Sequence, residues 1–263
     1  MIFLKTEEEI ELLRLSNQLV GMTLAEMAKL IAPGVTTLQL DKVAEEFIRD
    51  HGAIPTFKGF PNHLGQPFPG SICASVNDVV VHGIPNNTPL KEGDIVSIDC
   101  GTYMNGFCGD SAFTFAVGEI SSDAKKLLEV TRKSLYMGIE QARAGLRLGD
   151  IGAAVQSCAE SNGFGVVREF VGHGIGKEMH EEPQVPNYGR KGQGKQLKKG
   201  MCIAIEPMIT LGDKRIMMDN DGWTVRTFDG KYAAHFEHTI AVGPNNAEIL
   251  SNFELVDEVL GNK

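Results

Sequence analysis

Four carboxylates and one imidazole occur in or beside apolar segments, where an unpaired charge opposes folding. These residues are Asp99, Asp110, His173, Glu206 and Glu237. Two buried carboxylates repel each other unless a cation joins them. Oxygen ligands together with one imidazole suit hard or borderline divalent ions. The set therefore predicts a cage for two divalent metal ions, as found in hydrolases that activate water.

The spacing of the first two carboxylates indicates that they share one face of a β-hairpin. Asp99 ends the apolar run that starts at Ile95, and Asp110 comes eleven residues later, at the start of the next expected strand. Between them lies Asn105-Gly106, a strong signal for a tight hairpin turn. Residues of paired strands that point to the same face are close neighbours, so the two carboxylates are expected side by side.

Each of the five residues also has a structural explanation when it is taken alone. An aspartate beside a glycine is common in turns. A glutamate before a proline, such as Glu206, can cap an exposed strand end, and a histidine between glycines, such as His173, can pack in a core. All five are expected at strand ends, and this joint occurrence favours the metal site.

Paired helix signals precede strands in each half of the chain. Capping boxes at Thr6 and Thr36 begin two helices that end near Gly34 and Gly52. Strands are then expected over residues 71–81, 95–99 and 113–117. The second half repeats this order, with a helix from Ser122 to near Gly145, a helix over 151–161 capped by Asp150, and strands over 166–171, 201–205 and 235–242.

The spacing of glycines indicates an internal duplication. Eighteen residues separate Gly34 from Gly52, and eighteen separate Gly145 from Gly163. Two α+β halves, about 6–118 and 121–250, are expected to merge their strands into one curved antiparallel sheet with helices on its outer face. We expect residues 1–263 to form a single domain, with the site in a cleft between the halves.

Composition excludes several classes of function. The chain has 263 residues and a net charge of −9, which argues against nucleic acid as a main ligand. The basic stretch 191–199 is expected to be a solvated loop, with contact to ribosomal RNA as the alternative. The acidic start does not resemble a signal peptide, and no window approaches the roughly 18 apolar residues of a membrane span. Five cysteines without a CxxC pair suggest reduced thiols in the cytoplasm.

Several motifs, in their order and spacing, closely resemble the type I methionine aminopeptidases over nearly the whole chain. The motifs are Val81-His82-Gly83, Ser97-Ile98-Asp99, Cys108-Gly109-Asp110, Gly172-His173-Gly174, His180-Glu181-Glu182-Pro183, Ile205-Glu206-Pro207 and Phe236-Glu237-His238. The resemblance implies the pita-bread fold. It also implies an enzyme that removes the initiator methionine from nascent polypeptides when the second residue is small. We expect this enzyme to be cytoplasmic and a monomer.

The resemblance further implies a role for each of the predicted ligands. Asp99 would bind one metal through both oxygens, His173 and Glu206 would bind the other, and Asp110 and Glu237 would bridge them. The ions, which are Co, Mn, Fe or Zn, would acidify a shared water that attacks the first peptide carbonyl. Aminopeptidases are established examples of such two-metal hydrolases, with ions roughly 3.5–4 Å apart.

Other site residues are also implied by the resemblance. His82 would lie near the scissile amide nitrogen, His180 would hydrogen-bond the substrate carbonyl, and Glu206 would shuttle the proton. The methionine pocket would be formed by Cys73, Phe68, Met179 and Trp223. Phe68 stands where a tyrosine is common, and Met179 where an aromatic residue often precedes the histidine. The segment from Phe57 to Phe68 is longer than in the family, and this leaves open how wide the substrate entrance is.

Two alternatives remain at this point. Other pita-bread peptidases, such as prolidase and the aminopeptidase that cleaves before proline, usually carry an additional N-terminal domain. Non-catalytic pita-bread binding proteins have lost metal ligands, whereas all five are present in this chain. The methionine enzyme is therefore the favoured hypothesis.

Overall fold

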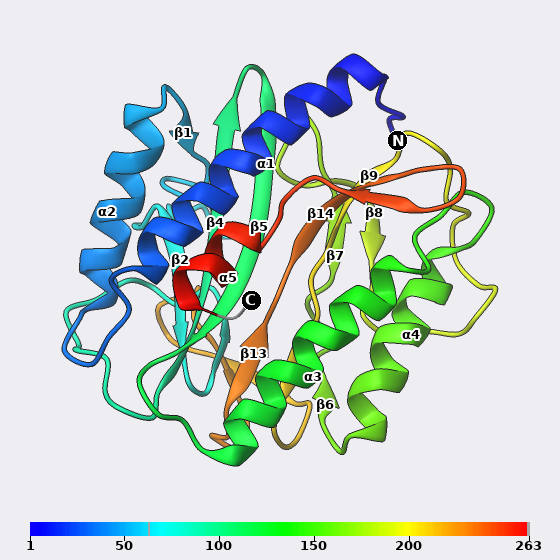
Figure 1. The fold of residues 1–263 in the computed structure, drawn as a ribbon. Helices are drawn as coiled ribbons and strands as arrows, with labels where there is room; N and C mark the ends of the chain where they lie inside the picture. The colour runs from blue at the N-terminus through cyan, green and yellow to red at the C-terminus, as the bar shows by residue number, and fades with distance from the viewer. Residues whose placement is uncertain (63, 262–263) are drawn as a thin grey trace.

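The computed structural model describes residues 1–62 and 64–261, and in it the helices cover one face of the strands (Figure 1). Within those residues the helices are α1 (Glu7–Ala28), α2 (Thr37–Asp50), α3 (Ser122–Ile139), α4 (Leu148–Ser161) and α5 (Glu254–Leu260). Buried apolar side chains fill the space between helices and strands, among them Leu24, Ile98, Leu127 and Leu135. None of the described helices is both long enough and apolar enough to cross a membrane.

The helix starts follow the predicted capping signals in three of four cases. The Thr6 hydroxyl accepts a hydrogen bond from the amide of Glu9, and Thr36 does the same for Gln39. The prediction that Asp150 caps α4 was wrong, because the helix begins at Leu148. Asp150 instead lies in the first turn, where its carboxylate accepts from the amide of Arg147 at 2.8 Å.

The duplication of the helical pairs is visible in the backbone. Gly34 and Gly145 have φ values of 96° and 95°, which favour glycine, and each lies between the long helix and the shorter helix of its half. The shorter helices, α2 and α4, both contain 14 residues. Each is followed by a two-residue strand, β1 (Ile54–Pro55) after α2 and β6 (Gly165–Val166) after α4.

The first half contains the predicted hairpin. Strands β4 (Ile95–Met104) and β5 (Phe107–Ala116) pair antiparallel around a two-residue turn at Asn105 and Gly106, whose φ values are 54° and 85°. Both strands are longer than predicted. The strand expected over 71–81 is divided into β2 (Ile72–Val76) and β3 (Val79–Val81), because Asn77 turns the chain with a φ of 56°.

The second half contributes most of the remaining strands. A five-stranded sheet has the order β15 (Ala247–Ile249), β14 (His238–Val242), β9 (Cys202–Ile205), β7 (Gly172–Gly174) and β8 (Glu181–Val185). Strands β13 (Ala233–His235), β10 (Met208–Thr210) and β6 form a second sheet, and β11 (Ile216–Met218), β12 (Val225–Thr227) and β3 a third. The strand expected over 166–171 ends at Val166, and the one expected over 235–242 is interrupted at residues 236 and 237.

Hydrogen bonds between β5 and the chain around β14 join the two halves. The amide of Glu237 donates to the carbonyl of Ala112 at 2.9 Å. The hydroxyl of Ser111 donates to the carbonyl of Glu237 at 2.7 Å, and that of Thr239 to the carbonyl of Asp110 at 2.8 Å. Because these contacts fix the backbone of Asp110 and Glu237, the junction itself positions two of the predicted ligands.

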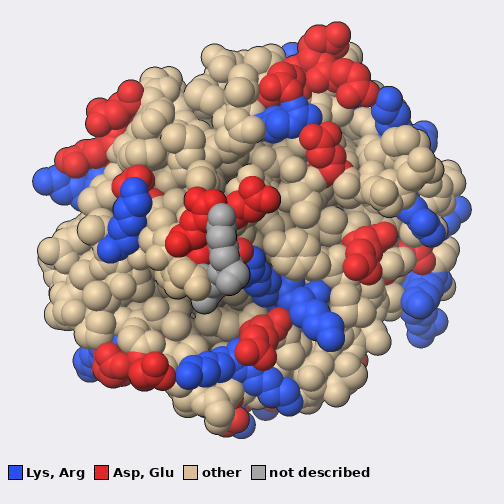
Figure 2. All heavy atoms as spheres, viewed as in Figure 1, with Lys and Arg blue, Asp and Glu red and all other residues tan. Residues whose placement is uncertain are grey.

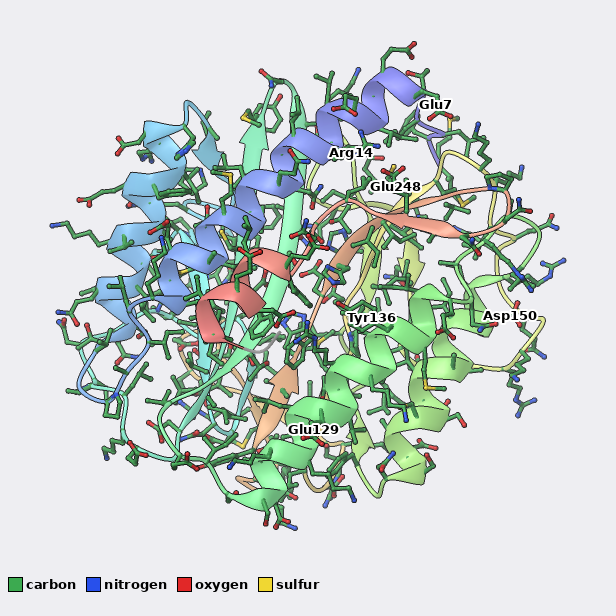
Figure 3. The ribbon with its side chains drawn as sticks, in the orientation of Figure 1. Glu7, Arg14, Glu129, Tyr136, Asp150 and Glu248 are labelled. Carbon is green, nitrogen blue, oxygen red and sulfur yellow. The ribbon has the colours of Figure 1, made fainter. Side chains whose placement is uncertain are left out.

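Charged side chains on the helical face are mixed in sign. Figure 2 shows acidic and basic groups interspersed over this face, with no field of a single sign. Some of these charges tie elements together: the guanidinium of Arg14 on α1 lies 2.7 Å from the carboxylate of Glu248 on β15, a pair that is labelled in Figure 3. The predicted site lies elsewhere, on the strands.

Candidate active site

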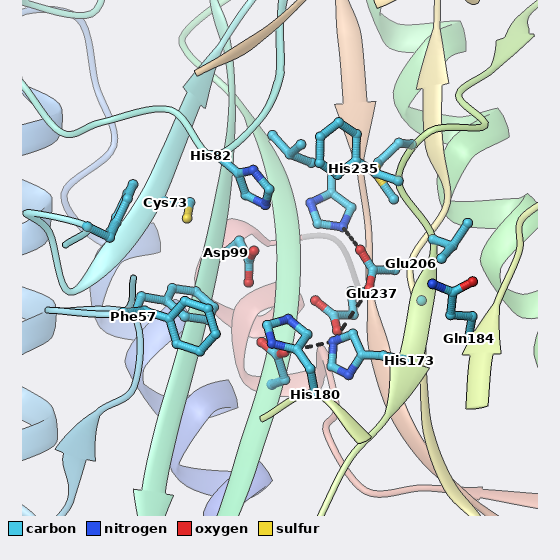
Figure 4. A pocket seen from close by; sticks show the side chains of 18 of the residues that line it. Phe57, Cys73, His82, Asp99, His173, His180, Gln184, Glu206, His235 and Glu237 are labelled. Carbon is cyan, nitrogen blue, oxygen red and sulfur yellow. Dashed lines mark ion pairs between the residues drawn. The ribbon is translucent and has the colours of Figure 1, made fainter. Parts of the chain in front are cut away.

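A cavity of about 480 Å³ brings together residues from both halves of the chain. Its lining contains nearly all of the predicted site residues, several of which are labelled in Figure 4. Those on the cavity wall are Phe68, Cys73, His82, Asp99, Asp110, His173, His180, Glu206, Trp223 and Glu237. The predicted site is therefore one place in the folded chain.

The two aspartates lie on the same face of the hairpin, as the spacing predicted. Asp99 is opposite Ala112 in the strand register and Asp110 is opposite Gly101, so the carboxylates are diagonal neighbours. Both lie inside their strands, and the prediction that they mark strand ends was wrong. The prediction is right for Glu206 and Glu237, because Glu206 directly follows β9 and Glu237 directly precedes β14.

The imidazole of His173 lies between two carboxylates. Its Nε2 atom is 3.5 Å from Asp110 Oδ2 and 3.6 Å from Glu206 Oε1. Its Nδ1 atom is 2.9 Å from the carbonyl oxygen of Gly174, which accepts a hydrogen bond when Nδ1 carries the proton. In that tautomer Nε2 carries a lone pair directed at the carboxylates, as a metal ligand requires. Ligand atoms of Asp110, His173 and Glu237 lie within 4.8 Å of one another.

Several buried carboxylate oxygens have no hydrogen-bond partner among the described residues. These atoms are Asp99 Oδ1, Asp110 Oδ1 and Glu237 Oε1, and all three belong to the cavity wall. Buried polar groups are normally hydrogen-bonded, so three orphaned acceptors in one place need an explanation. A divalent cation supplies it, because carboxylate oxygens and one imidazole nitrogen are its usual ligands. The residues present therefore fit a metal site.

The charges of these groups are strongly coupled in the protein. Burial, followed by the neighbouring carboxylates, raises the pKa values of Asp99 and Glu237 well above normal, and burial also raises that of Asp110. For His173, burial lowers the pKa, but the hydrogen bond to Asp110 and the charges of Glu206 and Asp110 outweigh it and raise the pKa to about 9. In the absence of a cation, these raised pKa values favour the protonated forms of the carboxyl groups.

Two further histidines face the cavity and are neutral at neutral pH. Burial lowers the pKa of His82 to about 4. Burial and the nearby charge of His173 lower the pKa of His180 to about 4 as well. His82 has a φ of 58°, an uncommon conformation for a residue with a side chain. Strain of this kind often marks functional positions, and here it directs the imidazole into the cavity (Figure 4).

The apolar end of the cavity contains three of the four residues predicted for the methionine pocket. The ring of Phe68 packs edge-on against Trp223 with ring centres 5.1 Å apart, and Cys73, which is buried, lines the same cavity. Met179 is the exception, because it does not line the cavity. It fills the space over Gly101, where an added Cβ atom would lie 2.6 Å from Met179 Cε.

The cavity also contains residues to which the sequence analysis assigned no role in the site. They are Phe57, Phe60, Val81, Phe170, Val171, Gly172, Glu181, Glu182, Gln184, Met208 and His235. His235 Nε2 lies 3.6 Å from Glu206 Oε2, and His235 is almost fully buried. The signal for His235 was its position two residues before Glu237, which places both side chains on the same face of an extended segment.

The long segment between Phe57 and Phe68 contributes to the cavity wall. The amide of Gly59 donates to the carbonyl of Phe68 and the amide of Phe68 to the carbonyl of Phe60, so the segment folds back on itself. The ring of Phe60 packs edge-on against His180 with ring centres 5.4 Å apart. Residue 63 lies outside the described residues. This segment therefore brings an aromatic ring to the cavity beside His180.

The fold and the metal-binding geometry define a metallopeptidase. The sequence matches Metallopeptidase family M24 over residues 11–244, and the chain belongs to this family. Within the family it is similar to methionine aminopeptidases. The one from Clostridium perfringens is 52% identical, over 95% of this chain and 99% of the relative. The methionine aminopeptidase 1 of Bacillus subtilis is 50% identical, over 95% of this chain and 99% of that protein.

A solved structure agrees with these sequence relationships. The crystal structure of methionine aminopeptidase from Rickettsia prowazekii superimposes with a TM-score of 0.92 and 43% identity, and the match covers 96% of this chain and all of that one. The α+β pita-bread fold predicted from the sequence is confirmed by this likeness.

Proposed function

We propose that this chain is a metal-dependent aminopeptidase that removes N-terminal methionine from polypeptides. The observation that carries the proposal is the cluster of Asp110, His173 and Glu237, whose ligand atoms lie within 4.8 Å of one another, in a cavity where Asp99, Asp110 and Glu237 each have a buried carboxylate oxygen without a hydrogen-bond partner among the described residues. Similarity to methionine aminopeptidases at about half identity over nearly the whole chain supports the substrate. The alternative of a non-catalytic binding protein is not supported, since all five predicted ligands line the cavity.

The metal centre is proposed to hold two divalent ions. Asp99 would hold one ion, His173 and Glu206 would hold the other, and Asp110 and Glu237 would contribute to both. When bound, such ions polarise the substrate carbonyl and lower the pKa of water, which makes it a nucleophile at neutral pH. Cobalt, manganese, iron and zinc all suit this ligand set, and availability decides among them.

The remaining polar residues orient the substrate and move protons. The neutral imidazole of His180 donates a hydrogen bond to the carbonyl oxygen as negative charge develops on it. His82 lies across the cavity, beside the nitrogen of the scissile amide. Glu206 accepts a proton during attack and returns it to the leaving amine. His235, 3.6 Å from Glu206, helps to orient that carboxylate.

The apolar end of the cavity is proposed to hold the methionine side chain. Phe68, Cys73 and Trp223 line it, and their buried surfaces suit a flexible, unbranched thioether. The α-amine of the substrate then lies among the carboxylates, which pair with its positive charge. This arrangement restricts cleavage to the first residue of a chain.

The cellular setting follows from the substrate. Nascent polypeptides begin with methionine and are made in the cytoplasm, and five buried free cysteines are compatible with a reducing compartment. We place the enzyme there as a monomer with one catalytic domain, residues 1–263, built from halves of about 6–118 and 121–250. The basic loop at 191–199 offers a transient contact with the ribosome.

Elemental analysis combined with an activity assay tests the proposal. Protein purified anaerobically should contain divalent metal and release methionine from a Met-Gly-type peptide. A chelator should abolish the release, and the returned metal should restore it. Metal-containing protein that binds the peptide without cleaving it would support the non-catalytic alternative instead. Cleavage only of peptides with proline in second position would support a prolidase-like enzyme.

A further inference from the structure

A second cavity, of about 420 Å³, adjoins the one that contains the metal ligands. Glu182 and Gln184 line both cavities, so the two spaces meet along these side chains. The other walls of the second cavity are Leu148, Gly149, Pro186, Tyr188, Gly189, Arg190, Gln193, Gly194 and Lys195. The proposed reaction uses none of these walls.

The shared boundary is one face of an edge strand. Strand β8 lies at the end of its sheet, because among the described strands it pairs only with β7. Glu182 and Gln184 are two residues apart on it, so both side chains point to the same face, and both are exposed. Pro186, two residues further on, lines the second cavity. The same face therefore runs from one cavity into the other.

The opposite wall is held rigidly against the start of α4. The amide of Leu148 donates to the carbonyl of Lys195 at 3.0 Å, and the amide of Gly149 donates to the backbone carbonyl of Gln193 at 2.9 Å. A Cβ atom added at Gly149 would lie 2.3 Å from the carbonyl oxygen of Arg190, so only glycine permits this close approach. The groove between this wall and β8 is thus a fixed feature of the fold.

The groove offers polar groups that suit a peptide main chain. Gln193 presents an amide that can both donate and accept, and Gln184 does the same from the strand side. The ring of Tyr188 is held by Arg168, whose Cζ atom lies 5.0 Å from the ring centre. Three glycines on the wall, Gly149, Gly189 and Gly194, let the chain segments that form it pack closely together. Such a surface binds extended chains of varied sequence, as an enzyme for many polypeptides needs.

We propose that this groove, lined by Gln184, Tyr188, Arg190 and Gln193, binds the fourth and following residues of the polypeptide substrate in an extended conformation. The inference rests on the proposed function, because it requires methionine and the second residue to occupy the metal cavity. The chain then leaves that cavity over Gln184, beside the ion pair that Glu182 makes with Lys195 of the opposite wall. An extended chain advances about 3.3 Å per residue, so a few residues suffice to reach Tyr188.

The test compares a short and a long substrate with the same first residues. Met-Ala-Ser-amide ends near the metal cavity, whereas a hexapeptide amide with the same start reaches the groove. Two or three hydrogen bonds in the groove should raise kcat/KM for the hexapeptide about tenfold over the tripeptide. In Tyr188→Ala and Arg190→Ala this ratio should fall toward one. The exposed Arg190 serves as the second variant, in case Tyr188→Ala does not fold.

Lys191→Ala is the matched control, because Lys191 lies in the same loop but outside the cavity lining. It should keep the ratio of the unmodified protein. Cleavage of both peptides with equal kcat/KM would overturn the role proposed for the groove and leave the proposed function intact. An unchanged ratio of hexapeptide to tripeptide kcat/KM in Arg190→Ala and Tyr188→Ala would do the same. Cleavage of neither peptide by metal-loaded protein would overturn the proposed function, and the groove with it.

Discussion

The ammonium group of Lys5 lies 2.5 Å from the carboxylate of Glu181, and their side chains are only 5% and 10% exposed. Lys5 also donates its amide to the carbonyl of Gly200 at 2.7 Å, which fixes the start of the chain. The other oxygen of Glu181 accepts from the amide of Lys177 at 3.0 Å. Because Glu181 directly follows His180, this pair anchors the loop that presents His180 to the cavity.

Lys5→Met should destabilise the protein and lower kcat without loss of metal. The change leaves the Glu181 carboxylate buried and unpaired, which typically costs about 3–5 kcal/mol. Urea unfolding measures the stability, and elemental analysis measures the metal. Lys199→Met is the control, since its pair with Glu7 is exposed and its loss should move the unfolding midpoint little. Equal midpoints for the two variants would show that the Lys5 pair has no special role.

Asp110→Ala should lose bound metal and, with it, activity. Asp110 is proposed as a shared ligand, so its removal leaves two cations without common negative charge. Metal content per chain should fall well below that of the unmodified protein, as measured by elemental analysis. Asp50→Ala, on the exposed end of α2, should retain both metal and turnover. An Asp110→Ala variant that keeps its ions and most of its turnover would disprove the ligand assignment.

His180→Ala should lower kcat strongly while the metal stays bound. His180 is proposed to donate to the developing oxyanion, and loss of one such donor typically costs about 10²–10³ in rate. His51→Ala, at the exposed end of α2, is the control and should leave kcat unchanged. Loss of metal from His180→Ala would instead make this residue a ligand, and an unchanged kcat would remove it from the reaction.

Much of this arrangement could be predicted because the signals are local. Thr6 and Thr36 cap helices through contacts only three residues away. The Asn105-Gly106 turn fixed the register of the hairpin and therefore the shared face of Asp99 and Asp110. These features depend on neighbours in the chain, which the sequence displays directly.

The errors arose where distant contacts decide the structure. Asp150 was expected to cap α4, but the amide of Leu148 bonds to Lys195, far along the chain, and the helix starts earlier. Met179 was placed in the methionine pocket by its position before His180, whereas packing over Gly101 removes it from the cavity wall. Strand ends were misplaced because pairing partners, which the sequence does not show, determine strand length.

Metal-free protein should become less stable as the pH rises from 6.5 to 8.5. The pKa of His173 is raised from 6.5 to about 9 on folding, and those of Asp99, Asp110 and Glu237 are also raised. A raised pKa means that the folded state binds the proton more tightly than the unfolded state does. The resulting contribution to the free energy of unfolding is lost as the pH rises through the pKa of the folded state.

Other histidines do not cancel this trend in the same range. The pKa values of His82 and His180 are lowered to about 4 and that of His238 to about 3, so their contributions change only below pH 6.5. Each raised group contributes up to about 1.4 kcal/mol per pH unit. Thermal unfolding of chelator-treated protein measures the slope, which should be shallower in Glu237→Gln. A melting temperature that is flat or rises with pH would contradict the raised pKa values of these buried groups.

Cleavage should require methionine in first position and a small residue in second position. The first requirement comes from the apolar end of the cavity, where Phe68 and Trp223 pack edge-on. The second comes from the ring of Phe60, which stands against His180 and narrows the space for the next side chain. A bulky second residue would push the carbonyl away from its proposed position, and a displacement of about 1 Å can cost roughly 10² in rate.

A peptide series Met-X-Ser-amide, with X from Gly to Leu, measures this selectivity as kcat/KM. The value should fall by about 10² between Gly and Leu, and Phe60→Ala should recover part of the loss for Leu, because it removes the ring beside His180. Leu64→Ala is the control, since Leu64 lies in the same segment but outside the cavity lining. Similar kcat/KM for Met-Gly and Met-Leu peptides would eliminate the narrow entrance. Comparable cleavage of Leu-Gly peptides would eliminate the methionine pocket, because Phe68 and Trp223 would then not be selecting the thioether.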